Sequence, residues 1–252
     1  MACKIPYATV EAMMASVSAK EVFSPAIPNT TRWVGSGLRS YYTGPFRGKP
    51  YRRALQSVLG ATRTLSDVQV PLEIPVLHVE AGRVVSYVGS PGHSTGGVHL
   101  ASLARASSAI SGIFEAESLL DPGFPEDHFV DPGLTEPIGS TLAETLRGQY
   151  DRILVLVSDL TRTPSTPNLR GVDWSYFKLL YQALASVYTE NMRRAALSVQ
   201  KHFGKTSRVQ IMRTPTGVDF WSFTGADLVR TAHATRDKAL TFLDNPGLSD
   251  QV

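Results

Sequence analysis

Apolar side chains recur at intervals of three and four residues over one long segment in the second half of the chain. Residues 174–203 contain no proline or glycine, while Asp173 is suited to cap the start of a helix and Gly204 to end it. The apolar positions are Trp174, Phe177, Leu180, Tyr181, Leu184, Val187, Tyr188 and Met192. This spacing predicts a long central helix over about 174–203.

Other segments have the β-branched composition of strands. Residues 68–80 and 83–88 lie on either side of a short Ala-Gly turn and predict a hairpin. Pro71 and Pro75 confine its first strand to an edge or a bulge. A buried strand is expected at 152–160, and a second hairpin at 208–212 with 218–223.

Shorter helices are expected at 9–20, 52–59, 97–117, 140–148 and 225–243. Prolines and glycines interrupt the chain between residues 24 and 50, and we find no internal repeat. The pattern predicts an α+β fold: a helix-dominated single domain with one or two β-hairpins and an irregular N-terminal arm. Residues 1–66 would form the first helix and the arm, and residues 67–252 the mixed α+β core.

Composition narrows the class of protein. With 252 residues, 42% of them hydrophobic and 19% charged, the chain can bury a core and is not a disordered polyelectrolyte. Its single cysteine, Cys3, excludes an intrachain disulfide and a cysteine-based zinc cluster. No apolar run approaches the length of a membrane span. We therefore expect a soluble, intracellular protein without a membrane partner.

The charged residues are segregated along the chain. Residues 22–66 contain seven basic side chains and no acid, residues 106–146 eight acids and no lysine or arginine, and residues 191–218 six basic side chains and no acid. Such blocks make a patterned surface potential, which the net charge of +3 alone would not indicate.

The stretch RSYYTGPFRGKPYRR, residues 39–53, alternates cations with aromatic rings. Cations suit phosphates and rings suit unpaired bases, so this composition favours a nucleic-acid contact. A loop whose tyrosines pack on the domain has the same composition. The residues expected to contact nucleic acid, with a second patch from the 191–218 block, are Arg39, Tyr41, Tyr42, Phe46, Arg47, Lys49, Tyr51, Arg52, Arg53, Arg193, Arg194, Lys201 and Lys205.

The segment GHSTGG, residues 92–97, matches the G-x-S-x-G pattern of a nucleophile elbow centred on Ser94. It resembles the elbow of α/β-hydrolases and, through GHSTGG, of patatin-like lipases. No oxyanion segment of either family precedes it, and neither His202 nor His233 lies in a recognisable catalytic loop. The alternative is a glycine-rich turn in which Ser94 or Thr95 caps the next helix, or in which that helix end holds a phosphate.

No metal or cofactor is expected from spacing. The six histidines show no ligand pattern, and the acidic block lacks the pattern of a calcium-binding loop. Acidic and basic blocks of similar strength instead favour head-to-tail association between copies of the chain.

The segments ARASSAISG, GSPGHS and RTPSTPN, together with the length, the basic pI and the lone cysteine, resemble the proline-alanine-serine-rich proteins of polymycoviruses. This resemblance implies an RNA-coating role in a fungal host, with double-stranded RNA as the partner. Our leading hypothesis is a non-enzymatic, self-associating RNA-binding protein of coat or nucleoprotein type, cytoplasmic in the host cell and associated with virions. We expect the RNA partner to be either single- or double-stranded. A serine hydrolase using Ser94 and a scaffold that binds only protein are the alternatives.

Overall fold

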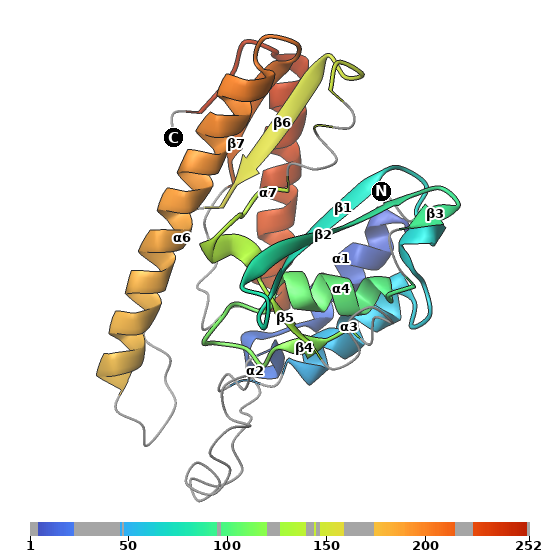
Figure 1. Ribbon diagram of the computed structural model, residues 1–252, viewed down its shortest axis with the longest axis vertical. Helices are drawn as coiled ribbons and strands as arrows, with labels where there is room; N and C mark the ends of the chain where they lie inside the picture. The colour runs from blue at the N-terminus through green and yellow to red at the C-terminus, as the bar shows by residue number, and fades with distance from the viewer. Residues whose placement is uncertain are drawn as a thin grey trace, which may run out of the picture. The chain divides into compact units, whose positions relative to one another are not determined.

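A computed structural model describes residues 5–22, 46, 48–94, 97–119, 127–139, 144, 147–158, 174–214 and 224–250 (Figure 1). The chain divides into two compact units, Met1–Pro132 and Gly133–Val252, each with its own hydrophobic cluster. The structure contains both helices and antiparallel and parallel strands, which confirms the expected α+β class. The boundary expected at residue 66 lies inside the first unit.

The first unit is built on a five-stranded sheet with the order β3-β2-β1-β5-β4, in which every neighbouring pair is antiparallel. Its strands are β1 (Leu72–His78), β2 (Arg83–Ser90), β3 (His93–Ser94), β4 (Glu117–Ser118) and β5 (His128–Val130). Strands β1 and β2 form the predicted hairpin, and its turn places Gly82 at a φ of +60°. Strand β5 pairs with β1 only at Leu77 and His78, so Pro75 removes no hydrogen bond between these two strands.

The helices of this unit are α1 (Tyr7–Ser16), α2 (Ala19–Val22), α3 (Lys49–Leu59) and α4 (Leu100–Ser107), with 3₁₀ turns at Leu65–Asp67 and Pro132–Leu134. The helix expected at 9–20 is thus two helices, and the one expected at 52–59 begins three residues earlier. Helix α4 packs on the sheet because Leu100, Leu103 and Ala106 are buried with Tyr87 and Phe129 in one cluster.

The helix expected over 97–117 is much shorter, and its end has a physical cause. The Ser107 hydroxyl donates to the Pro75 carbonyl (2.8 Å), and the Ser108 hydroxyl donates to the Ala104 carbonyl (2.8 Å). Serine hydroxyls that compete for backbone groups favour helix ends over helix interiors. Gly112 then takes a φ of +79°, which starts a new direction of the chain toward β4.

The second unit is a β-α-β-α arrangement of β6 (Arg152–Val157), α6 (Trp174–Phe203), β7 (Arg208–Arg213) and α7 (Gly225–Asp244) (Figure 1). Strands β6 and β7 are parallel, with Arg152 opposite Arg208 and Val157 opposite Arg213. Parallel strands need a long crossover, which α6 supplies. The bounds of α6 and α7 confirm both predicted helices.

The expected second hairpin is not the pairing that β7 makes. Its partner in the structure is β6, while the other half of that hairpin, residues 218–223, lies outside the described residues. The outer edge of β7 is occupied by the C-terminal segment, since the Asp250 N–H donates to the Ile211 carbonyl (2.8 Å). Most of the helix expected at 140–148 also lies outside the described residues.

The core of this unit is formed by Val155, Val157, Met192, Ala196 and Ile211. Helix α7 begins at a capping box in which Thr224 and Asp227 satisfy each other's backbone N–H groups. No helix that the described residues form has the length and apolar composition needed to span a membrane.

Candidate nucleic-acid interface

The aromatic and basic stretch at 39–53 is described only from its middle onward. Arg39, Tyr41, Tyr42 and Arg47 lie outside the described residues. Lys49 and Arg53 are exposed on α3, and Tyr51 is half-buried on the same helix. These three expected contacts therefore keep accessible surface.

Phe46 belongs to the core and not to an exposed stacking surface. It is 3% exposed, its N–H donates to the Ile113 carbonyl (3.2 Å), and its ring centroid lies 6.3 Å from that of Phe114. A base stacks only on a ring whose face is open to it, so the expected stacking role is corrected for this residue. The ring instead packs beside Phe114 in the interior of the first unit.

Arg52 is committed to an ion pair within the chain. Its Nη1 lies 2.8 Å from Oε1 of Glu117, and its Nη2 donates to the Ser102 hydroxyl (3.2 Å). Glu117 is buried at the start of β4, and burial raises the pKa of its carboxyl while Arg52 and Arg105 oppose that shift. The basic and acidic blocks thus meet here inside one molecule.

A second arginine completes this buried cluster. Arg105 on α4 is 2% exposed, donates to the Glu115 carbonyl (3.2 Å) and lies 5.1 Å from the centroid of the Phe114 ring. Burial lowers the pKa of its guanidinium, and Glu117 opposes that shift. Gly48, at a φ of +51°, makes room for it, since a Cβ there would lie 1.9 Å from Nη2 of Arg105.

Two cations of the second patch share one carboxylate on α6. Arg193 Nε and Arg194 Nε each lie 2.8 Å from an oxygen of Glu190. Hydrogen bonds from these two arginines lower the pKa of Glu190 to about 2. Glu190 therefore offsets one of the two positive charges at this end of the patch.

Lys201 and Lys205 line an open hollow of about 870 Å³ where α6 ends and both strands of the sheet begin. Arg152 and Arg208 line the same hollow, and among the described residues that line it Asp151 is the only acid. The parallel register places Arg152 directly opposite Arg208. Like charges on directly opposed residues weaken strand pairing. The two arginines therefore do not stabilise the sheet, and their placement needs another explanation.

The end of α6 accounts for only part of this charge. A helix C-terminus carries roughly half a negative charge, which favours nearby cations. The described lining holds four cations and one carboxylate, so a positive surplus remains. Arg152 Nη1 donates a hydrogen bond to the Leu243 carbonyl (2.5 Å), and within the described part of the chain no other hydrogen bond or ion pair engages these four side chains. We call these four residues, Arg152, Lys201, Lys205 and Arg208, the basic hollow.

The sequence pattern identified half of the basic hollow. Lys201 and Lys205 follow from the block without acids. Arg208 lies in the same block but was not singled out, and Arg152 stands alone at the start of a strand. The available signal was a cation at the first position of each of the two strands. These cations lie opposite each other only because the strands pair in parallel, which the sequence alone did not predict.

Ser94 is not at a nucleophile elbow in this fold. Its backbone lies in β3, where it pairs with Gly89 of β2 in an antiparallel hairpin. An elbow instead requires a sharp turn from a strand directly into a helix. Helix α4 starts only at Leu100, with His99 as its N-cap, so neither Ser94 nor Thr95 caps it.

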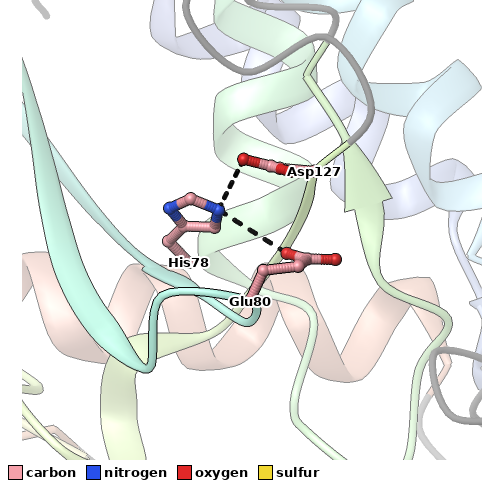
Figure 2. A group of neighbouring side chains, drawn as sticks. All are labelled: His78, Glu80 and Asp127. Carbon is pink, nitrogen blue, oxygen red and sulfur yellow. Dashed lines mark ion pairs between the residues drawn. The ribbon is translucent and has the colours of Figure 1, made fainter.

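One group of side chains in the described residues has the composition of a metal site. His78, Glu80 and Asp127 each offer a ligand atom, and these atoms lie within 4.8 Å of one another (Figure 2). The sequence did not identify these three residues as ligands, because Asp127 lies almost fifty residues after His78 and Glu80 and joins them only through the pairing of β1 with β5.

No protein-family model matches this sequence, and no curated protein matches it at a significant level.

Proposed function

We propose that this protein is a non-enzymatic RNA-binding protein that contacts the phosphate backbone through the basic hollow. The observation that carries the proposal is the placement of Arg152 opposite Arg208 beside Lys201 and Lys205. Four cations placed together without an equal number of acids repel one another, and an anionic ligand would reduce this repulsion. A polyanion such as RNA supplies several phosphates at once.

The lining also indicates how the RNA is bound. None of the described residues that line the basic hollow is aromatic, so the proposed contacts there are to phosphates and do not involve base stacking. Contacts to phosphates carry no sequence information and apply equally to single and double strands. The resemblance to polymycovirus proline-alanine-serine-rich proteins favours duplex RNA, in which the phosphates are regularly spaced.

The same proposal includes association between copies of the chain, as coat proteins and nucleoproteins show. Its support is the charge segregation along the chain, because the acidic residues outside the Arg52–Glu117 pair can attract the basic surface of another copy. Such a protein would act in the cytoplasm of the host cell, bound to the viral RNA of the virion.

Filter binding to a duplex RNA across a salt series tests the function. We expect retention at about 50 mM salt that falls steeply by about 200 mM, because each neutralised phosphate releases counterions. Absence of retention at the lower salt, or a retention that salt does not change, would contradict the proposal. Light scattering with and without RNA distinguishes RNA-dependent assembly from a scaffold that binds only protein.

A further inference from the structure

The pairing of β1 with β5 brings four titratable side chains together in the first unit. His78 ends β1, Glu80 lies in the turn that follows, and Asp127 and His128 stand where β5 begins. The backbone fixes this approach, since His78 is opposite Phe129 and the Val79 N–H donates to the His128 carbonyl (2.9 Å). Segments almost fifty residues apart therefore meet at one point.

The ring of His78 is held in a defined orientation. It is 4% exposed and stacks on Phe129 with the ring centroids 5.0 Å apart. Its Nε2 faces both carboxylates, 2.8 Å from Oδ2 of Asp127 and 3.6 Å from Oε2 of Glu80 (Figure 2). Packing thus positions a nitrogen donor between two oxygen donors before any ligand arrives.

These separations suit a small divalent ion. Zinc binds imidazole nitrogen and carboxylate oxygen at about 2.0–2.2 Å, so tetrahedral donors lie about 3.4 Å apart. The two observed separations, 2.8 and 3.6 Å, lie on either side of that value. All three donor atoms lie within 4.8 Å of one another, and both carboxylates are partly exposed, so their side chains can adjust toward an ion.

The charge of the cluster also favours a cation. The ion pairs that Glu80 and Asp127 form are with His78 and His128, and within the described residues no lysine or arginine pairs with either carboxylate. Glu117, Glu190 and Asp250 by contrast each pair with an arginine or a lysine. With neutral imidazoles the cluster carries two negative charges that a divalent ion balances.

We propose that His78, Glu80 and Asp127 bind a divalent transition-metal ion of the zinc class. His128 is a positioning residue, because its Nδ1 lies 2.7 Å from Oε1 of Glu80 and its N–H donates to Oε2 of the same carboxylate (2.9 Å). Such outer partners orient a ligand and tune its affinity. Glu80 and Asp127 are about 30% exposed, so the site opens to solvent and leaves a coordination position for water.

The bound ion would join three segments of the first unit: the end of β1, the β1–β2 turn and the start of β5. Metal binding to a folded state stabilises that state by mass action. The inference is independent of RNA binding, because none of the four residues belongs to the basic hollow of the second unit.

Calorimetric titration of zinc into the chelator-treated full-length protein tests the site, with cobalt(II) absorption as a spectroscopic readout. We expect one equivalent to bind, a tetrahedral cobalt spectrum and a higher unfolding temperature. Asp127→Asn and Glu80→Gln should weaken binding by at least about tenfold. His93→Ala, at an exposed histidine of the same unit, is the matched control and should bind as the wild type does.

The positioning role has its own readout. His128→Ala should weaken binding by about 10- to 100-fold while it retains the tetrahedral cobalt spectrum, whereas loss of a ligand should change that spectrum. His78 is buried, so its replacement can disturb the fold; the two carboxylate variants, checked by circular dichroism, decide the question. No saturable binding, or unchanged affinity in both folded carboxylate variants, would overturn the proposal.

Discussion

Arg52 and Glu117 form an ion pair of 2.8 Å that joins the N-terminal basic block to the acidic block within a single chain. From the sequence, opposed blocks of charge suggested contacts between copies. The Arg52–Glu117 contact instead lies within one molecule, and Glu117 is buried. Part of the charge segregation therefore stabilises the first unit, and Arg52 is a structural residue before it is a ligand contact.

Replacement of Arg52 by methionine is expected to destabilise the first unit by about 1–3 kcal/mol, because the buried Glu117 carboxylate loses its ion pair and keeps only the weaker attraction of Arg105. Arg53→Met, at an exposed neighbour on the same helix, should change the free energy of unfolding by less than about 0.5 kcal/mol. Urea denaturation measures both. Equal stability of the two variants would show that the ion pair contributes nothing.

Gly48→Ala is expected to cost more than Gly82→Ala. Both glycines have positive φ, at +51° and +60°, so both substitutions meet a left-handed conformation that costs roughly 1–2 kcal/mol. Only at Gly48 does the new Cβ also approach the Arg105 guanidinium, whereas nothing lies within 4 Å at Gly82. Denaturation curves of the two variants isolate this clash, and equal losses would argue against the buried position of Arg105.

The C-terminal segment should make stability depend on pH. Burial of Asp250 would raise its pKa, but hydrogen bonds from Lys238 and from the Arg213 N–H outweigh it, so the pKa is lowered. A carboxyl with a lower pKa in the folded state stabilises above its unfolded value of about 3.9, and this contribution is lost as pH falls through the folded pKa.

Asp250→Asn should therefore be less stable than the wild type at pH 7, by on the order of 1 kcal/mol after solvent screening. The difference should shrink as the pH is lowered below about 4. Thermal unfolding across that range checks it, and a difference that persists unchanged at low pH would contradict the assignment.

Ser94 is expected to be unreactive toward a fluorophosphonate probe, because its backbone lies in a β-hairpin rather than at a strand-to-helix turn. Gel fluorescence of the labelled protein is the measurement, with Ser94→Ala as the comparison. Labelling of the wild type that disappears in the variant would revive the hydrolase alternative.

The long helix and the first hairpin were predictable from the sequence because their signals are local. No proline or glycine interrupts 174–203, and β-branched runs flank the turn at Gly82. The length of α4 was not predictable in this way, since its end depends on the hydrogen bond from the Ser107 hydroxyl to the Pro75 carbonyl, which forms only once β1 lies beside the helix.

The basic hollow and the cluster around His78 also contain residues that the local sequence does not reveal. Lys201 and Lys205 were identified from a block without acids. Arg152 joins them only through the parallel register of β6 and β7, and His78 meets Asp127 only through the pairing of β1 with β5. Pairing between distant segments leaves no local spacing in the sequence, so these residues required the fold.

The most direct test of the RNA-binding account is the salt dependence of duplex RNA binding by the double variant Arg152→Gln, Arg208→Gln. Each lost phosphate contact should reduce the slope of log affinity against log salt by about 1, so the double variant should lose roughly 2 and bind more weakly at low salt. Arg236→Gln is the matched control, since Asp237 already neutralises that exposed cation (2.9 Å). A double variant with the affinity and slope of the wild type would contradict the account.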